Sequence, residues 1–160
     1  MPQSTRERFW MEPIGRIRRE DDGVVLEIDA PFRPALTDLE HFSHVMVFWW
    51  AGEFDNEEDR ARLFIKPPYA PDREIGVFAT RSPFRPNPIA MTTCPILSID
   101  QEAGRVRVGE IDAFDGTQVV DLKAYLPICD RVQEPRTPPW LDDWPAWLPE
   151  AGMRLVDPKE

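Results

Sequence analysis

A proline-rich stretch in the middle of the chain limits the possible folds more than any other feature. Residues 76–90 read GVFATRSPFRPNPIA, with Pro83, Pro86 and Pro88 close together. Proline fixes φ and lacks the amide donor, so these residues cannot lie in a central strand or in the interior of a helix. Residues that precede a proline are pushed toward extended geometry. The stretch therefore predicts a stiff loop that follows a strand at residues 75–80.

The side chains of this loop suit a binding role. It would hold Arg81, Phe84, Arg85 and Asn87 with little freedom. Rigid loops that present guanidinium groups and an aromatic ring bind anions, carboxylates, phosphates or flat nitrogenous rings. Residues 60–85 contain six cations and two acids in a chain whose net charge is -10, so the positive charge is segregated. The alternative is a proline-rich turn whose arginines pair with acids elsewhere in the chain.

Composition indicates one domain with flanking segments. A chain of 160 residues with 42% hydrophobic content can bury one core, and 18 prolines favour short strands and ordered loops over long helices. We expect an N-terminal arm at 1–12, a barrel domain at 13–134 and a tail at 135–160. The net charge argues against a general nucleic-acid coat protein. No apolar run approaches eighteen residues, so we expect a soluble protein without a transmembrane helix. Cys94 and Cys129 are far apart in the sequence and sit in apolar surroundings, so we expect a cytoplasmic protein without a disulfide.

Short alternating and apolar segments predict an all-β fold. A hairpin is expected from residues 13–18 and 24–28, which flank an acidic turn. Further strands are expected at 42–50, which should be buried on both faces, and at 62–66, 75–80, 88–99, 104–111 and 119–122. One helical turn capped by Thr37 and an acidic loop at 53–59 complete the pattern. Seven or more short strands indicate a barrel or sandwich, and closure into a single small β-barrel would remove exposed edges.

The tail has no strand period and is rich in tryptophan and proline. Trp140, Trp144 and Trp147 lie close together in the sequence. Aromatic side chains at that density need burial, either against the barrel or against a second subunit.

A second cluster of polar residues lies near the end of the barrel domain. Asp112 ends a strand, Asp115 and Gly116 form a turn, and Asp121, Lys123 and Tyr125 alternate onto one face. Carboxylates at the end of a strand can bind a ribose diol or accept a proton. The alternative is a turn that only reverses the chain, together with a surface ion pair of small energy. Dinucleotide-binding, phosphate-loop and zinc motifs are absent, and His41 and His44 fit structural hydrogen bonds better than a metal site.

Four motifs resemble one family. Residues 76–91 resemble the signature of the TsaA-like (TrmO) family of S-adenosylmethionine-dependent tRNA methyltransferases, and residues 112–127 (DAFDGTQVVDLKAYLP) resemble its second signature. Residues 39–44 and 13–17 match two further segments in the same order. The resemblance implies a small β-barrel methyltransferase, a homodimer, with S-adenosyl-L-methionine as cofactor. It also implies that the substrate is the threonylcarbamoyl-modified adenosine beside the tRNA anticodon, methylated on its exocyclic nitrogen.

The resemblance assigns roles to particular residues. By family position the cofactor would contact Arg81, Met91, Gly109, Glu110, Ile111 and Asp112. We add Phe84 or Trp49 as an aromatic face for the cofactor. Our candidates for catalysis on the substrate side are Asp115, Asp121, Lys123 and Tyr125. Arg62, Lys66 and Arg85 would meet tRNA phosphates, and no metal is expected.

Some family features are missing. The family commonly has a loop with the sequence PRQPG after its first strand, whereas here residues 17–23 run directly into the second strand. Ala51 and Gly52 replace a Phe-His pair, and Ala90 and Ala124 replace a glycine and a proline. A large C-terminal domain, common in bacterial members, is also not expected. Two alternatives therefore stay open: a non-catalytic S-adenosylmethionine-binding barrel, and a methyltransferase with another acceptor.

Overall fold

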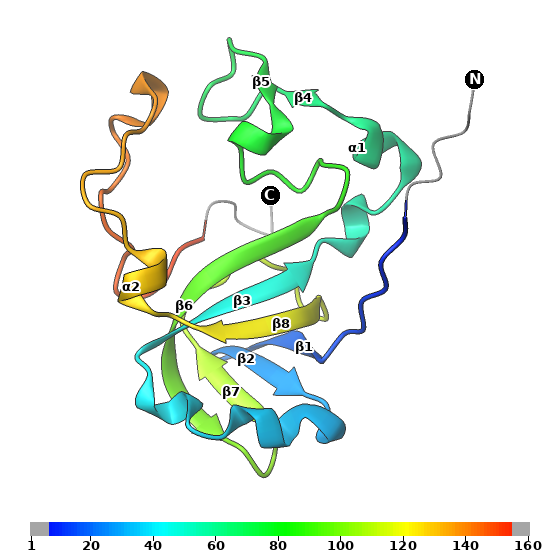
Figure 1. The fold of residues 1–160 in the computed structure, drawn as a ribbon, viewed down its shortest axis with the longest axis vertical. Helices are drawn as coiled ribbons and strands as arrows, with labels where there is room; N and C mark the ends of the chain where they lie inside the picture. The colour runs from blue at the N-terminus through cyan, green and yellow to red at the C-terminus, as the bar shows by residue number, and fades with distance from the viewer. Residues whose placement is uncertain (1–6, 155–160) are drawn as a thin grey trace.

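Six antiparallel strands form a closed barrel in the order β1-β2-β7-β6-β3-β8 (Figure 1). A computed structural model describes residues 7–154. The barrel strands are β1 (Gly15–Glu20), β2 (Gly23–Ile28), β3 (His44–Trp50), β6 (Ile89–Asp100), β7 (Arg105–Val108) and β8 (Gln118–Ala124). The expected all-β barrel is confirmed.

Alternation of apolar side chains builds the barrel interior. Val45 and Val47 of β3 are fully buried with Leu26, Val106 and Val119 from three other strands. The expectation that β3 is buried on both faces is wrong, because Met46 and Phe48 are only half-buried. A strand in a closed barrel has one inward face, so the long apolar run of this strand reflects partial cover outside the barrel as well as burial within it.

The first hairpin is as short as the sequence predicts. Glu20 pairs with Gly23, which leaves a turn of Asp21 and Asp22 with no room for a longer loop. Arg107 donates to the backbone oxygen of Asp22 and forms an ion pair with its carboxylate at 3.0 Å. The hydrogen bond from Arg107 lowers the pKa of the Asp22 carboxyl below its usual value.

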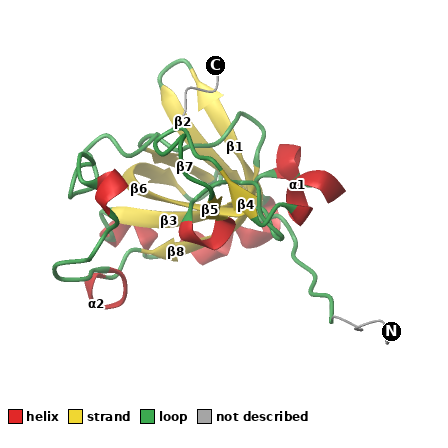
Figure 2. Cartoon of the chain, turned by 90° about the horizontal axis from the view of Figure 1, so that it is seen from above, coloured by secondary structure: helices red, strands yellow, loops and turns green. Residues whose placement is uncertain are grey.

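A cap made of short elements lies between β3 and β6. It contains the 3-10 helices η3 (Gly52–Phe54) and η4 (Val77–Ala79), the helix α1 (Glu57–Ala61), and a two-stranded sheet of β4 (Phe64–Ile65) and β5 (Ile75–Gly76). Figure 1 shows this cap above the barrel, and in Figure 2, seen from above, β4 and β5 lie over the barrel strands with α1 to one side.

The structure corrects several expected boundaries in the cap. The predicted loop at 53–59 contains η3 and the start of α1, because the Asn56 side chain accepts a hydrogen bond from the Asp59 amide and caps the helix. The predicted strands at 62–66 and 75–80 shrink to two residues each, since β4 and β5 pair only with one another. After Gly76 the chain turns into η4, where the Thr80 hydroxyl donates to the Val77 carbonyl.

Two further elements differ from expectation near the barrel. Thr37 caps no helix start: it follows η1 (Ala30–Leu36), and its hydroxyl donates back to Pro34, while η2 (Leu39–His41) begins after Asp38. The strand expected at 104–111 ends at Val108. The Gly109 amide still bonds to Pro95 of β6, but the next amide, that of Glu110, bonds to Ala151 of the tail.

The tail leaves the barrel and then returns to it. α2 (Pro127–Asp130) precedes the tail, which contains η5 (Pro139–Leu141) and reaches the barrel again where Gly152 bridges to Glu110. In Figure 1 the orange and red part of the chain follows this path along one side of the molecule.

The structure can be compared with two further expectations from the sequence: the setting of the two cysteines and the lack of a transmembrane helix. Both cysteines are free thiols; Cys94 is buried in the core, but Cys129 is exposed, which corrects the expected apolar setting. Within residues 7–154 no helix is long and apolar enough to cross a membrane.

Candidate functional site

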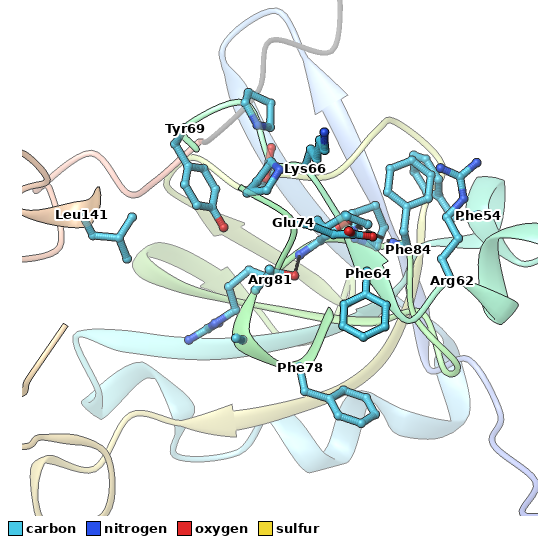
Figure 3. A pocket seen from close by; sticks show the side chains of 18 of the residues that line it. Phe54, Arg62, Phe64, Lys66, Tyr69, Glu74, Phe78, Arg81, Phe84 and Leu141 are labelled. Atoms are coloured by element: carbon cyan, nitrogen blue, oxygen red, sulfur yellow. Dashed lines mark hydrogen bonds between the residues drawn. The ribbon is translucent and has the colours of Figure 1, made fainter. Parts of the chain in front are cut away.

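The candidate site is a cavity of about 970 Å³ between the cap and the tail, called the large cavity below (Figure 3). Aromatic rings line it from several elements: Phe54, Phe64, Tyr69, Phe78, Phe84 and Trp144. Charged side chains are interspersed with them: Arg62, Lys66, Glu74, Arg81 and Asp112. Figure 3 shows Tyr69 and Leu141 on one side, Arg62 and Phe84 on the other, with Arg81 between them. Such a lining suits a flat ring that carries both charged and polar groups.

The proline-rich loop is held by its own side chains. Arg85 donates to the carbonyl oxygens of Thr80 at 3.3 Å and Ser82 at 3.1 Å. The Ser82 amide donates to the Thr80 hydroxyl, and the Phe84 amide donates to the Ser82 hydroxyl. Arg85 therefore stabilises the loop through its Nη1 atom.

Arg81 has a different environment from Arg85. Its side chain lines the cavity, and among the described residues it makes no hydrogen bond, ion pair or ring contact. An exposed guanidinium at a cavity wall can bind a ligand carboxylate or phosphate through two parallel hydrogen bonds.

Helix α1 and its neighbours brace this loop from the side opposite the tail. The Arg62 guanidinium lies 4.6 Å from the centre of the Phe84 ring, and Phe54 meets the same ring edge to face at 5.0 Å. Arg60 donates to Asn87 at 3.2 Å and to Asp55 at 2.8 Å. The Arg60 hydrogen bond, aided by one from Trp50, lowers the pKa of the Asp55 carboxyl. Phe84 is thus packed within the wall, with Arg62 already over its ring.

A smaller cavity of about 170 Å³ adjoins the large one at the barrel. Arg81, Asp112, Phe54 and Pro83 line both cavities. Trp49 lines only the small one, and its indole donates to the Thr92 hydroxyl at 3.3 Å. Arg81 and Asp112 therefore stand where a ligand could extend from one cavity into the other.

An arginine pair surrounds Glu110 beside the small cavity. Arg19 donates to the carbonyls of Ile111 and Ala113 and lies 3.6 Å from the Glu110 carboxylate, and Arg154 lies 3.9 Å from the same oxygen. That oxygen, Oε2, is buried without a hydrogen bond among the described residues. Arg19 and Arg154 both line the small cavity, together with the acidic residues Glu53 and Asp112, so groups of both charges border it.

The seven residues predicted to bind cofactor do not all lie together. Arg81, Phe84 and Asp112 line the large cavity. Ile111 is fully buried in the barrel core, and the Glu110 amide donates to Ala151 of the tail. Gly109 lies against Pro95 and the Ala151 carbonyl, and Met91 pairs with Phe48 in the barrel wall. The tail thus covers the Gly109–Glu110 edge that the sequence analysis assigned to the cofactor.

The four candidate catalytic residues lie outside both cavities. Asp115 accepts from the Arg19 amide at 2.8 Å and lies 3.8 Å from Arg18, which fits a role in the turn. Asp121 and Lys123 form an exposed ion pair at 3.0 Å on β8. Tyr125 packs near His44, with ring centres 6.2 Å apart.

The histidines have local partners. His44 shares a 2.8 Å hydrogen bond with Ser43, and His41 lies 3.8 Å from Asp38. Asp38, Glu40 and His41 bring three possible metal-ligand atoms within 4.8 Å of one another, although all three residues are exposed. The sequence spacing did not predict this grouping, because the left-handed Asp38 turns its side chain toward His41.

Sequence reasoning missed much of the cavity wall. Phe54, Phe64, Tyr69 and Phe78 lie in segments that were interpreted only as loops or strands, and Leu141 and Trp144 come from the tail. The cluster of tail tryptophans was the one available signal, because it indicated aromatic surface that needs a partner. Lys66 and Arg62 both line the cavity, and Arg62 is also engaged with Glu58, Asp59 and Phe84.

The fold and the site together define a class: a small closed antiparallel barrel whose capping loops enclose a ligand cavity. A profile of the tRNA-methyltransferase O N-terminal domain matches residues 9–131. The chain belongs to this family. The resemblance found in the motifs is thereby confirmed.

Relatives with known names support the same placement. The chain is 42% identical over 119 residues to a probable S-adenosyl-L-methionine-binding protein of Archaeoglobus fulgidus, covering 74% of this chain and 30% of that one. It is 33% identical to a similarly described protein of Methanocaldococcus jannaschii, covering 73% of this chain and 92% of that one. A putative S-adenosylmethionine-dependent methyltransferase, RcsF of Pseudomonas aeruginosa, is 37% identical, covering 83% of this chain and 62% of its own length.

Solved structures show the same barrel. TrmO from Pseudomonas aeruginosa superposes with a TM-score of 0.65 at 27% identity, covering 85% of this chain and 63% of that one. A second TrmO structure gives a TM-score of 0.63 at 30% identity, covering 83% and 66%. The chain thus spans less than two thirds of both solved structures and 30% of the Archaeoglobus relative.

Proposed function

We propose that this protein is an S-adenosylmethionine-dependent methyltransferase that acts on threonylcarbamoyl-adenosine beside the tRNA anticodon. Family membership and the names of the relatives support the cofactor and the reaction class. The observation that carries the proposal is the position of Arg81 and Asp112, which line both the large and the small cavity. A cofactor and an acceptor that meet there would be held by fixed groups of opposite charge.

The residues of the large cavity fit this cofactor. A volume of about 970 Å³ is within the range of small-molecule sites. Aromatic walls suit the adenine ring, and Arg81, which has no partner among residues 7–154, suits the α-carboxylate. Glu74 and Asp112 can accept from ribose hydroxyls or the α-amino group. The other predicted cofactor residues, Met91 and Gly109 to Ile111, would support the wall from the barrel side rather than contact the ligand.

The protein's own contribution is alignment. Bound S-adenosylmethionine supplies a methyl group on a sulfonium sulfur, and the acceptor nitrogen must approach it in line with the carbon–sulfur bond. Holding both partners in that geometry removes a large part of the barrier without covalent catalysis. The acceptor nitrogen also loses one proton when it gains the methyl group. Glu74 and Asp112 line the cavity and are better placed to receive that proton than Asp115, Asp121, Lys123 or Tyr125.

Labelled methyl transfer tests the proposal. The protein is incubated with methyl-labelled S-adenosylmethionine and tRNA that carries threonylcarbamoyl-adenosine, with the same tRNA lacking the modification as control. Label only in the modified tRNA is the expected result. Arg81→Ala is expected to abolish the rise in melting temperature caused by the cofactor, whereas the matched variant Arg105→Ala, which lines neither cavity, should keep it. An unchanged cofactor shift in Arg81→Ala would refute the role given to Arg81.

A second candidate is a non-catalytic S-adenosylmethionine-binding barrel. It is favoured by the position of the four candidate catalytic residues, which lie outside both cavities. Cofactor binding without transfer to tRNA or to any other RNA would support this candidate over the enzyme. Transfer to an unmodified RNA would instead indicate a methyltransferase with another acceptor.

We further propose a homodimer that works in the cytoplasm, where its tRNA substrate is found. Ile128 is 94% exposed and Val132 is 69% exposed on α2 and the segment that follows. Exposed apolar side chains that lie close together suit a second copy of the chain. A monomeric mass in solution at micromolar concentration would contradict the dimer.

A further inference from the structure

The tail supplies part of the wall of the large cavity. Leu141 and Trp144 line it together with residues of the cap. The Trp144 ring meets the Tyr69 ring edge to face, with centres 5.1 Å apart, and the Arg73 guanidinium lies 4.4 Å from the centre of the Trp140 ring. Two contacts thus join the tail to the segment between β4 and β5. Neither contact is needed for the barrel core, which contains neither tryptophan.

A second attachment fixes the end of the tail to the barrel. The Glu110 amide donates to the Ala151 carbonyl at 2.8 Å, and Gly152 bridges to Glu110 in parallel. Gly152 has φ +91°, and a Cβ there would lie 2.7 Å from the Glu110 carbonyl oxygen. Only glycine allows this close approach without a shift of the backbone. The segment 139–154 is therefore held at both ends, and its residues Leu141 and Trp144 line the cavity.

We propose that Trp144 is a ligand-binding residue and that the segment 139–154 closes the cavity around a purine ring. Trp144 keeps 38% of its surface exposed although Tyr69 packs against it. An edge-to-face contact fixes the orientation of two rings but leaves ring surface on which a flat base can stack. The inference rests on the proposed function, which supplies the nucleoside.

The chemistry of the wall favours a purine over other flat groups. Tyr69 and Trp144 offer aromatic surface, while Glu74 and Lys66 nearby can accept from and donate to the polar edge of a base. Stacking of a base on an aromatic side chain contributes about 1–3 kcal/mol, which equals roughly a five- to 150-fold change in affinity. The purine is either the adenine of the cofactor or a base of the RNA, and the experiment below distinguishes these two sources by which ligands lose affinity.

Three variants of the full chain test the proposal by calorimetry. Trp144→Ala removes the ring, Trp144→Phe keeps a smaller ring, and Trp147→Ala is the matched control in the same tail. Trp147 is 73% exposed, touches Arg131, and lines neither cavity. The ligands are S-adenosylhomocysteine, 5′-methylthioadenosine and a threonylcarbamoyl-modified anticodon stem-loop RNA. Trp144→Ala is expected to bind at least one of them about five- to 150-fold more weakly, Trp144→Phe to lose less, and Trp147→Ala to match the unaltered protein.

The pattern of losses identifies the source of the purine. Equal losses for both nucleosides with unchanged RNA binding assign the ring to the cofactor adenine, and loss for the RNA alone assigns it to a substrate base. Full affinity of Trp144→Ala for all three ligands overturns the inference while leaving the proposed function intact. Binding of none of them by the unaltered protein refutes both. A variant could also alter the fold, so a second measurement uses the unaltered protein. The indole N–H signal that is absent from the NMR spectrum of Trp144→Phe is assigned to Trp144. This signal must shift when ligand is added to the unaltered protein.

Discussion

At the scale of single residues, Gly152 determines whether the tail can lie against the barrel. Gly152→Ala would place a Cβ 2.7 Å from one Glu110 atom and 2.8 Å from another, at φ +91°. Gly116→Ala is the matched control, because Gly116 also has positive φ, +79°, but nothing lies within 4 Å of its Cβ position. Both variants carry the left-handed backbone cost of about 1–2 kcal/mol, and only Gly152→Ala adds the clash.

We expect Gly152→Ala to release the tail locally rather than to unfold the barrel. Its Glu110 amide, which donates to Ala151 in the native chain, should exchange with deuterium faster. Proteolysis in the segment 139–150 should also accelerate, while Gly116→Ala should leave both measurements near those of the unaltered protein. Equal protection of the Glu110 amide in the two glycine variants would contradict the role of Gly152.

The two cysteines differ in burial, and their chemistry should differ with it. Burial raises the pKa of the Cys94 thiol to about 12, with a further contribution from Glu110, whereas Cys129 is exposed. Because the thiolate is the reactive form, a thiol reagent at pH 8 should label only Cys129 in the native protein and both cysteines in denaturant. Rapid labelling of both in the native protein would contradict the buried position of Cys94.

The same shift predicts how stability changes in alkali. The folded chain keeps the Cys94 proton up to about pH 12, while the thiol of the unfolded chain, whose ordinary pKa is 9.0, loses its proton at a lower pH. The contribution of Cys94 is therefore complete below pH 9 and is lost as pH rises toward 12. Cys94→Ala should show a flatter decline of unfolding free energy between pH 9 and 11 than the unaltered protein, whatever its stability at neutral pH.

At the scale of elements, α1 and the proline-rich loop form one braced unit. Arg62 lies over Phe84 at 4.6 Å and also pairs with Asp59 at 3.1 Å, so it connects the helix end to the loop that carries Arg81. A cation over an exposed aromatic ring contributes about 0.5–1 kcal/mol. Arg62→Ala should therefore weaken binding of S-adenosylhomocysteine by about two- to fivefold through a looser loop.

The controls separate ring stacking from charge. Arg62→Lys keeps the charge but lacks the planar guanidinium, so it should lose part of the affinity. Glu58→Gln removes an exposed ion-pair partner of Arg62 at 3.1 Å and should change affinity little. A loss in Glu58→Gln equal to that in Arg62→Ala would show that the ion pairs, not the contact with Phe84, hold the loop.

The elements also show how far local sequence carries structural information. Strands such as those expected at 13–18 and 104–111 could be predicted because period-two alternation reflects the one inward face of the barrel. The short elements η3, α1, β4 and β5 could not, because a cap residue such as Asn56 or a pairing of two residues decides them. The wall between the cap and the tail depends on contacts such as that of Tyr69 with Trp144, which lie far apart in sequence and leave no periodic trace.

The candidate site shows the same division. Arg81 and Asp112 belong to motifs that the resemblance assigned to the cofactor, and Phe84 lies in the first of these motifs; all three line the large cavity. Gly109 to Ile111 belong to a motif too, but the returning tail covers that edge, a feature that lies outside the motif. Local motifs thus predicted which loop carries the ligand-binding side chains, and tertiary contacts decided which of those side chains reach the cavity.

At the scale of the whole molecule, the positive charge of residues 60–85, the cationic window, is largely compensated by contacts within the fold. Arg60 pairs with Asp55, Arg62 with Glu58 and Asp59, Arg73 stacks on Trp140, and Arg85 binds loop carbonyls. Among the described residues of the window, Lys66 and Arg81 are left without such partners, and both line the large cavity. Within this window, the cations without such partners among the described residues therefore both lie at the large cavity.

This distribution predicts a weak salt dependence of RNA binding. Each phosphate neutralised by a cation contributes about -0.7 to the slope of log affinity against log salt for single-stranded RNA, so two cations give roughly -1.4. The double variant Lys66→Gln/Arg81→Gln should remove most of that slope for a threonylcarbamoyl-modified anticodon stem-loop. Arg105→Gln is the control: it removes one cation that pairs with Glu20 and Glu27 and lines neither cavity, so the slope should stay. A slope steeper than about -4 in the unaltered protein would require some six phosphate contacts and would show that RNA binds a wider surface than these two residues provide.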